Sequence, residues 1–316
     1  MKNKILITGG AGNIGSFIVD QCVELGHDVV VVDNFYNGKF RNIEKHLSSK
    51  RIELETIDIG NWEMVKYVFD KHKPEYVSHQ ASLMIMDSNK FPRKSIETNI
   101  QGTFNIIQAC SDYHVKKLTY GSSASVYGNP RVVPVTEDHP FDNQTLYGAT
   151  KIAKEALMHS WAFSHNVSFI GFRYFNIYSE RQGLGAFYTQ VFQKWIHAIH
   201  EGGEIIMYGD GEQTMDLVHS YDAAKANVLA MFNDNVKNEH FNVGTGKETS
   251  LKELLSIIEN LMDKKANVKH VESDPHFVRR RCASIEKITN QLGFVPTVTV
   301  EEGTKRYIKN LLEGKI

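Results

Sequence analysis

A glycine-rich turn near the N-terminus constrains the fold of this chain more than any other segment. The apolar run from Lys4 to Thr8 leads directly into it, and an amphipathic segment follows. Glycine allows a tight turn and a close backbone approach, and the start of a helix offers free N–H groups and the positive end of a dipole. The arrangement predicts a pocket for the pyrophosphate of a dinucleotide. The candidate residues are Gly9, Gly12, Asn13, Ile14 and Gly15.

A second apolar run, from Asp28 to Asp33, ends in a carboxylate 18 positions after Gly15. A carboxylate at this place can accept both hydroxyls of an adenosine ribose and repels a 2′-phosphate, so NAD is favoured over NADP as the cofactor. A tight turn that binds nothing is the alternative interpretation. The strand before the glycines, the helix after them and Asp33 together disfavour that alternative.

The composition disfavours several classes of protein. The 36 Lys and Arg residues nearly balance the 37 Asp and Glu residues, and no basic stripe suggests nucleic acid or a membrane surface as a partner. No apolar run approaches the roughly 20 residues of a transmembrane helix. The N-terminal apolar run is too short for a signal peptide, so a cytoplasmic protein is expected. Cys22, Cys110 and Cys282 are scattered, which predicts neither a disulfide framework nor a metal site.

Strand and helix patterns alternate through the first half of the chain. Such alternation predicts an α/β protein with a Rossmann-type, doubly wound parallel sheet, whose carboxyl edge holds the ligands. The predicted strands are 4–8, 28–33, 52–57, 75–78 and 116–121, and the predicted helices are 13–25, 61–72, 94–113 and 147–165.

The second half is more mixed. Ser250 and Glu253 form a capping box before an apolar segment, which predicts the start of a helix. We expect residues 1–176 to form the NAD-binding domain, with its sheet completed by part of 205–246, and residues 177–316 to form a smaller C-terminal α/β lobe that binds the substrate. Further strands are expected at 169–173 and 239–244, and further helices at 185–201, 283–292 and 300–313.

Tyr147 and Lys151 are four residues apart, so on a helix they share one face. Tyrosine is a poor base at its usual pKa of about 10, and a nearby ammonium group lowers that pKa. Ser123 and Ser125 follow the predicted strand 116–121, and either hydroxyl could position a substrate against Tyr147. The alternatives are an ordinary surface Tyr/Lys pair and a serine-rich turn whose hydroxyls are satisfied locally.

Ordered motifs along nearly the whole chain resemble the extended short-chain dehydrogenase/reductase superfamily. They are most similar to its NAD-dependent nucleotide-sugar epimerase and dehydratase branch, typified by UDP-glucose 4-epimerase. The number and order of the motifs make this resemblance specific. The motifs are the glycines at 9, 12 and 15, Asp33–Gly38, Asp58–Ile59, His79–Ser82, Asn99–Thr103, Ser122–Tyr127, Tyr147 with Lys151, Arg173–Asn176, Tyr208–Gln213 and Asn242–Gly246.

The resemblance implies site residues as well as a fold. Ser123, Tyr147 and Lys151 would be the catalytic set, and Ser123, Ser125 and Asn176 would contact the substrate. Beyond the glycine turn, the implied NAD contacts are Asp33, Asn34, Asn37 and Gly38 at the adenosine ribose, Asp58 and Ile59 at the adenine, and Ala81, Ser82, Asn99, Tyr147, Lys151 and Tyr174 at the nicotinamide half.

The implied reaction is the 4-epimerisation of a nucleotide-diphosphate sugar. Tyr147, as a phenolate, takes the proton of the C4 hydroxyl, hydride passes to NAD, and the transient 4-keto sugar rotates before hydride returns to its other face. A dehydrogenase that releases the keto sugar and a non-catalytic NAD-binding sensor are the alternatives. Ala124 and Ser125 stand where the dehydratases carry an Asp-Glu pair, so 4,6-dehydration is disfavoured.

Two positions depart from the diphosphate-binding pattern of this branch. Met215 and Asp274 stand where arginines are usual. Arg181 or the arginine triplet that ends at Arg281, with Arg280 as its candidate residue, could supply the missing charge. A solvated charge cluster is the alternative interpretation of the triplet. The alignment also places Arg281 near the sugar pocket, and the nucleotide base and the sugar stay open.

The resemblance also implies a homodimer. The helices at 94–113 and 147–165 of two copies would form a four-helix bundle across a two-fold axis. Apolar residues on these helices could serve that interface or could face the sheet. They are Ile100, Phe104, Ile107, Leu157 and Trp161.

Overall fold

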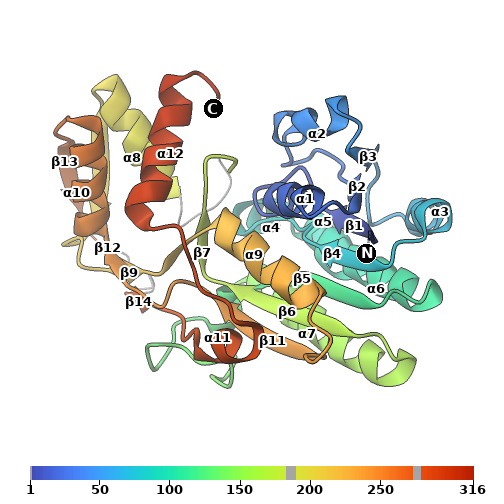
Figure 1. Cartoon of the computed structure of the whole chain (residues 1–316). Helices are drawn as coiled ribbons and strands as arrows, with labels where there is room; N and C mark the ends of the chain where they lie inside the picture. Colours follow the sequence, from blue (N-terminus) through green and yellow to red (C-terminus); the bar gives the residue numbers. More distant parts are fainter. Residues whose placement is uncertain (1, 183–189, 273–278) are drawn as a thin grey trace.

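The computed structural model describes residues 2–182, 190–272 and 279–316. Its main sheet has seven strands in the order β11-β6-β5-β4-β1-β2-β3, all parallel (Figure 1). The winding reverses between β1 and β4, as in a Rossmann-type sheet, which confirms the predicted fold class. The strands are β1 (Lys4–Thr8), β2 (Asp28–Val32), β3 (Ile52–Glu55), β4 (Tyr76–His79), β5 (Lys117–Ser123), β6 (Phe169–Tyr174) and β11 (Glu239–Val243).

Helices cover both faces of this sheet. Successive residues of a strand point to opposite faces. Leu6 therefore packs in the core formed with α3, α6 and α7, whereas Ile5 and Ile7 pack in the core formed with α1 and α9, which lie side by side in Figure 1. Burial on both faces is what a parallel sheet requires. These helices are α1 (Gly15–Glu24), α3 (Trp62–His72), α6 (Gly102–Asp112), α7 (Leu146–His165) and α9 (Ser220–Met231).

Polar caps fix where several helices begin. The Thr145 hydroxyl accepts a hydrogen bond from the Gly148 N–H at 3.0 Å, which caps the start of α7. The Ser250 hydroxyl accepts from the Glu253 N–H at 3.1 Å at the start of α10 (Leu251–Met262), so this predicted helix start is confirmed. The cap of α7 matters for the site, because it sets which side chains of α7 face the sheet.

The helix predicted over 94–113 is interrupted. It consists of α5 (Pro92–Ile96), a π-helical turn at Glu97–Gln101, and α6. Within this turn the Asn99 side chain accepts the Leu83 N–H at 2.7 Å and donates to the Leu83 carbonyl at 3.1 Å. Single π-helical turns are found frequently at functional sites, and here the turn carries a side chain predicted to hold the cofactor.

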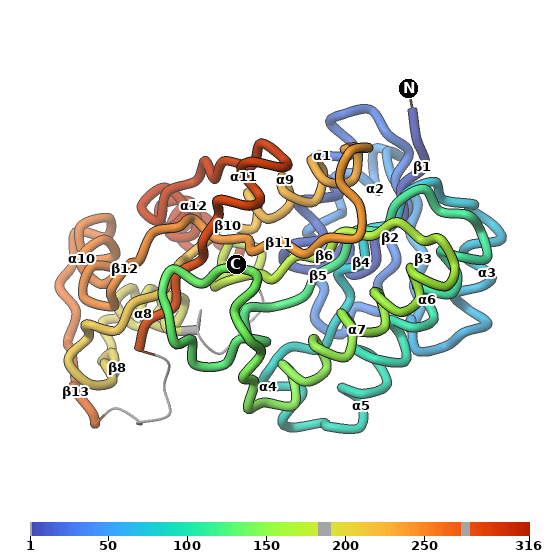
Figure 2. Tube along the Cα trace, turned by 90° about the horizontal axis from the view of Figure 1, so that it is seen from below, coloured from blue at the N-terminus to red at the C-terminus, as the bar shows by residue number. Residues whose placement is uncertain are grey.

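The C-terminal part contains a second core. Helices α8 (Gln190–Glu201), α10 and α12 (Val300–Leu312) share it, and Figure 2 shows this group at one end of the molecule. In contrast, α9, β11 and α11 (Glu286–Leu292) pack with the main sheet, although they follow residue 177. The domain boundary at 176/177 stays a prediction.

The remaining elements named here are short. Residues 183–189, which include the first part of the predicted helix 185–201, lie outside the described residues. The remaining short helices are α2 (Glu44–Ser48) and α4 (Ile85–Lys90). The short strands are β7 (Asn176–Tyr178) paired with β10 (Leu217–His219), β8 (Glu204–Tyr208) paired with β13 (Asn267–Val271), and β9 (Thr214–Met215) paired with β12 (Thr249–Ser250) and β14 (Arg280–Arg281).

Lys154 is fully buried between α7 and the main sheet. Its Nζ lies 5.9 Å from the centre of the Tyr120 ring and, among the described residues, has no hydrogen-bond partner. Burial, and then the neighbouring Lys151, lower the pKa of Lys154 well below its usual 10.5. A buried polar group without a hydrogen-bond partner costs stability, whichever protonation state it holds.

We expect Lys154→Met to stabilise the protein by about 1–3 kcal/mol at neutral pH, because a side chain of similar length replaces an unpartnered polar group. The gain should grow as the pH falls from 10.5, since the unfolded lysine binds a proton more readily than the buried one. Urea unfolding at several pH values measures this difference. The exposed Lys66→Met on α3 is the control, with a change within about 0.5 kcal/mol. A less stable K154M protein would contradict the prediction.

Candidate active site

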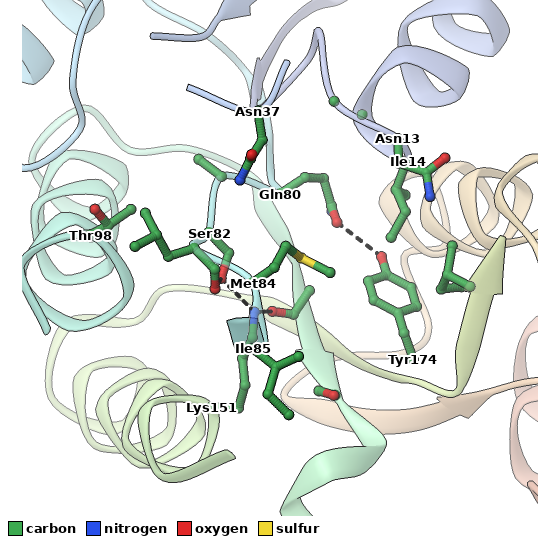
Figure 3. A pocket seen from close by; sticks show the side chains of 18 of the residues that line it. Asn13, Ile14, Asn37, Gln80, Ser82, Met84, Ile85, Thr98, Lys151 and Tyr174 are labelled. Atoms are coloured by element: carbon green, nitrogen blue, oxygen red, sulfur yellow. Dashed lines mark hydrogen bonds between the residues drawn. The ribbon is translucent and has the colours of Figure 1, made fainter. Parts of the chain in front are cut away.

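A cavity of about 270 Å³ lies at the carboxyl edge of the main sheet (Figure 3). This is where the winding reverses, and where ligands of doubly wound sheets bind. Figure 3 shows Asn13 and Ile14 on one side of the cavity and Ser82 and Lys151 on the other. The predicted site residues that line it are Gly9, Gly12, Asn13, Ile14, Gly15, Asp33, Asn34, Asn37, Gly38, Ile59, Ala81, Ser82, Ser123, Ser125, Tyr147, Lys151, Tyr174 and Asn176.

Backbone crowding explains the glycines of the loop after β1. A Cβ at Gly15 would lie 2.1 Å from the Gly9 carbonyl oxygen, and a Cβ at Gly9, where φ is +66°, would lie 2.7 Å from the Ala81 nitrogen. Only glycine leaves this backbone in place. The resulting hollow, at the N-terminal end of α1, suits a pyrophosphate.

Asn13 links the glycine loop to the second half of the chain. Its Oδ1 accepts hydrogen bonds from the hydroxyls of Ser179 and Ser220. Ser179 directly follows β7, and Ser220 is the first residue of α9. One amide oxygen therefore holds three chain segments together at the edge of the cavity.

Asp33 is held in a fixed orientation at the end of β2. Its carboxylate accepts the Ala11 N–H at 2.9 Å and the Phe35 N–H at 2.8 Å. A Cβ at Gly38 would lie 2.7 Å from the Asp33 carboxylate, so glycine leaves room beside it. Burial raises the pKa of Asp33, and the two backbone bonds act in the opposite direction. The carboxylate faces the cavity, where it can accept hydrogen bonds from the hydroxyls of a ribose.

Asp58 was predicted to contact the adenine, but it does not line the cavity. It forms a salt bridge with Lys94 at 2.9 Å and accepts the Asn34 amide at 3.3 Å. Burial raises the pKa of Asp58, but the hydrogen bond from Lys94 and further bonds leave it lower than usual. Its neighbours Ile57 and Ile59 line the cavity instead.

Lys151 and Tyr147 meet at the carboxyl end of β5. The Lys151 ammonium donates to the Ser82 hydroxyl at 2.9 Å (Figure 3) and to the Gly121 carbonyl at 3.2 Å. Its Nζ lies 5.2 Å from the centre of the Tyr147 ring. Ser123 lines the same cavity, and its hydroxyl donates to the Ser125 hydroxyl at 3.1 Å. The predicted catalytic residues are therefore brought together in one place.

Burial outweighs local charge in setting the pKa values of this pair. Burial raises the pKa of Tyr147 to about 12, and the Ser123 hydroxyl opposes the shift. Burial lowers the pKa of Lys151 to about 7, and Glu155 opposes that shift. The expectation that Lys151 holds the tyrosine pKa below 10 is thus wrong for the protein chain by itself, because a buried amine is only partly charged at neutral pH.

Asn99 does not line the cavity, but its side chain forms hydrogen bonds with two segments that do. In addition to the bonds with Leu83, it accepts the Ser82 hydroxyl at 3.0 Å and donates to the Thr150 hydroxyl at 3.1 Å. It thereby joins the segment after β4, which carries Ser82, to α7, which carries Lys151. Its predicted contact with the nicotinamide half stays a prediction.

A buried ion pair anchors the catalytic face of α7. The Arg173 guanidinium on β6 contacts the Glu155 carboxylate at 2.8 Å. Glu155 also accepts the Ser122 hydroxyl, and Arg173 donates to the Tyr127 hydroxyl at 2.8 Å. Glu155 lies four residues after Lys151, on the same face of the helix. The pair thus connects that face to β5, to β6 and to the turn after β5.

Sequence reasoning missed two side chains that hold Tyr174. The Tyr174 hydroxyl donates to Gln80 Oε1 at 3.1 Å (Figure 3) and accepts the Asn227 amide at 2.7 Å. Gln80 in turn donates to Asn227 at 3.0 Å, which closes a ring of three hydrogen bonds. Gln80 lies within the motif His79–Ser82, but Asn227 is on α9, far along the sequence, and no local sequence pattern points to it.

The structure places two predicted substrate contacts outside the cavity. Arg181 forms a salt bridge with Asp20 at 2.5 Å, and its guanidinium lies 4.0 Å from the centre of the Phe17 ring, so it packs against α1. Arg280 is exposed and forms a salt bridge with Glu248. Its neighbour in the triplet, Arg281, lines the cavity. Met215 is buried in β9, and Asp274 lies outside the described residues.

None of the helices within 2–182, 190–272 and 279–316 combines the length and the apolar character that a membrane crossing demands. The same residues contain no group of three or more His, Cys, Asp or Glu placed to hold a metal ion.

We expect Gly15→Ala to weaken NAD binding at least about 10-fold, because the added Cβ would displace the backbone of the loop at Gly9. Calorimetric titration with NAD measures the loss. Gly203→Ala is the control, since its Cβ would meet nothing closer than 3.5 Å, and NAD affinity should not change. Unaltered affinity of a folded G15A protein would show that the loop does not receive the cofactor.

Known proteins match this chain over nearly its full length. A putative UDP-glucose 4-epimerase of Methanocaldococcus jannaschii is 33% identical and covers 96% of the chain and 97% of the relative. A UDP-N-acetyl-alpha-D-glucosaminuronate decarboxylase of Bacillus cytotoxicus is 32% identical, with 98% of each chain covered. The crystal structure of the Thermotoga maritima UDP-glucose 4-epimerase with UDP-glucose superimposes with a TM-score of 0.91, at 30% identity, over 98% of this chain and 99% of that one.

Residues 5–244 match the NAD dependent epimerase/dehydratase family. This range contains the glycine loop, Asp33, Ser123, Tyr147 and Lys151. The match and the likeness of fold confirm the resemblance to the extended short-chain dehydrogenases. The chain belongs to the NAD-dependent epimerase/dehydratase family and is an enzyme of the epimerase and oxidoreductase class.

Proposed function

We propose that this enzyme catalyses the 4-epimerisation of a nucleotide-diphosphate sugar through a transient 4-keto sugar. One observation carries the proposal. Ser123, Tyr147 and Lys151 converge in the same cavity as the glycine loop and Asp33. A proton acceptor and a dinucleotide site that share one cavity are what reversible oxidation of a hydroxyl requires.

The residues of the cavity fit NAD. The loop at Gly15 would receive the pyrophosphate, because a Cβ there would fill the hollow. Asp33 would accept the ribose hydroxyls at the adenosine end, and Lys151 with Ser82 would hold the ribose of the nicotinamide half. Bound NAD would supply a reversible hydride acceptor for the sugar C4.

The phenol of Tyr147 would take up the proton of the C4 hydroxyl and return it. Ser123, which lines the same cavity, would orient that hydroxyl. Because burial holds the pKa of Tyr147 at about 12, the phenolate needs a positive charge nearby. Lys151 provides one when it is protonated, and with a pKa of about 7 it gains its proton as the pH falls to neutral and below. Lys151 therefore acts on the base rather than on the substrate.

Dehydration is a weaker candidate. It requires carboxyl groups near the sugar to remove one proton and to protonate a leaving hydroxyl. Among the described residues that line the cavity, Asp33 is the one carboxylate, and it follows β2 at the adenosine end. Ala124 and Ser125 offer no carboxyl group beside the base.

We also propose that two copies associate through α5, α6 and α7. Apolar side chains on this side remain partly or largely exposed in the single chain, including Phe91 and Ile96 at 43% each and Phe163 at 92%. Phe104 and Trp161 pack edge to face between α6 and α7, with ring centres 5.1 Å apart, and form a firm base for such a contact. Sedimentation velocity would test the association, and a monomer at micromolar concentration would count against it.

A panel of UDP-glucose, UDP-N-acetylglucosamine and UDP-glucuronic acid separates the candidate reactions. With the NAD-loaded enzyme, 4-epimerisation converts one sugar to its C4 isomer with no lasting change in nicotinamide absorbance. Chromatography of the sugars and absorbance spectra together give the result. Accumulation of NADH with a keto sugar would instead identify a dehydrogenase, and a bound dinucleotide without turnover of any sugar would favour a sensor.

We expect Tyr147→Phe to lower kcat by about 10²–10⁴-fold, because it removes the proton acceptor while the ring remains. NAD binding should persist, since the loop at Gly15 is untouched. The exposed Tyr67→Phe on α3 is the matched control and should leave kcat unchanged. Isomer formation is measured in single-time-point and progress-curve assays. Full activity of the Y147F protein would remove Tyr147 from the reaction.

A further inference from the structure

Asn37 and Gly38 lie in the loop between β2 and the 3₁₀ turn at Phe40–Asn42, at the adenosine end of the cavity. Both residues line the cavity, and Figure 3 shows the Asn37 side chain there. Asn37 is exposed, lies outside any helix or strand, and is the one asparagine of the sequence that a glycine follows. We propose that Asn37 is a site of spontaneous deamidation, and that the modification weakens the binding of NAD.

The reaction uses the backbone nitrogen of the residue that follows the asparagine. The Gly38 nitrogen loses its proton and attacks the carbonyl carbon of the Asn37 side chain. A C–N bond forms there, the bond to the side-chain amide nitrogen breaks, and this nitrogen takes up a proton and leaves as ammonia. Water then opens the resulting succinimide ring at one of its two carbonyl carbons, which yields aspartate or isoaspartate.

The local structure of the loop favours this attack. Glycine has no side chain to shield its nitrogen, and it gives the backbone wide rotational freedom. Among the residues that the structure describes, no group accepts a hydrogen bond from the Gly38 N–H, so no partner holds its proton. In the same part of the chain, one hydrogen bond restrains the Asn37 side chain, from its Nδ2 to Asp87 Oδ2 at 3.2 Å, and this bond is exposed to solvent.

The cofactor site itself requires the glycine. A Cβ at Gly38 would lie 2.7 Å from Asp33 Oδ1 and 2.8 Å from Asp33 Oδ2. A larger residue at this position would therefore displace the carboxylate that is placed to accept the ribose hydroxyls. The reactive pair cannot be removed by exchanging Gly38 without disturbing Asp33. The susceptibility of Asn37 thus follows from the position of the carboxylate beside it.

Deamidation changes the electrostatics at this end of the cavity. The Asn37 amide donates to Asp87 of α4, whereas an ionised carboxylate has no hydrogen to donate. Two carboxylates at such a distance repel each other strongly. Isoaspartate also lengthens the backbone by one carbon, which moves Gly38 relative to Asp33. Both products therefore disturb the part of the cavity that receives the adenosine half of NAD.

Peptide mapping by mass spectrometry, on protein aged in mildly alkaline buffer, tests the modification. Asn34 is the internal control, because it is exposed in the same loop but precedes Phe35. The Phe35 N–H donates to Asp33 at 2.8 Å, so this nitrogen is both shielded and occupied. We expect Asn37 to convert at least about 10-fold faster than Asn34, since only Asn37 has a free glycine nitrogen next to it.

Calorimetric titration with NAD tests the consequence. The affinity of the aged protein should fall in proportion to the converted fraction, whereas aged Asn37→Gln protein should keep the affinity that it has when fresh. Asn37→Asp reproduces one product, and we expect it to bind NAD at least about fivefold more weakly than the parent protein. Combining it with Asp87→Asn exchanges donor and acceptor and should recover most of that loss. Asn260→Asp, which adds the same charge at an exposed position of α10, is the matched control and should leave the affinity unchanged.

Three results would overturn the proposal. They are conversion of Asn37 no faster than that of Asn34, an unchanged NAD affinity of protein whose Asn37 has converted, and an N37D protein that binds NAD like the parent. A loss in N37D that Asp87→Asn does not reduce would overturn the assignment of the effect to the Asp87 pair. Thermal unfolding confirms that each variant is folded. Sugar turnover is not measured, so a failure of 4-epimerisation would leave these results intact.

Discussion

The buried contact between Arg173 and Glu155 is the interaction on which the site depends most. Two charges removed from water cost free energy unless further hydrogen bonds complete their coordination. Here the hydroxyls of Ser122 and Tyr127 do so. Because Glu155 shares a helix face with Lys151, the pair fixes the rotation of α7 against the sheet. The positions of the catalytic side chains follow from it, and a loss of either partner would leave an uncompensated charge beneath the reactive centre.

Burial also disfavours the charged forms of the two side chains in the reactive centre, Tyr147 and Lys151. Burial raises the pKa of the tyrosine to about 12 and lowers that of the lysine to about 7, so at neutral pH the tyrosine is neutral and the lysine is only partly charged. Charge carried by bound ligands therefore has a large effect in this cavity, because little protein charge and little water compete with it. Arg281 stands apart, since a guanidinium keeps its proton when buried.

The sheet, its order of elements and the glycine loop could be predicted from apolar periodicity and glycine spacing, because these are local signals, whereas most of the other cavity residues followed from the resemblance of motifs to a known family. The capping box at Ser250 is also a local signal. Arg280 was chosen as the candidate of the triplet, whereas Arg281 lines the cavity, because the pairing of β14 with β9 that decides between them joins segments far apart in the chain. The predicted direction of the Tyr147 pKa shift was wrong for a related reason. The spacing indicates that Lys151 is near, but it does not indicate how completely both side chains are buried.

Asn13 has a consequence for motion. Its single amide oxygen joins the cofactor loop to the ends of two segments from the C-terminal half, one leading out of β7 and one leading into α9. Displacement of the loop must therefore carry these segments along or break the bonds that join it to them. The strand that carries Asn176 is thereby joined to the cofactor loop through Ser179, the residue that directly follows that strand.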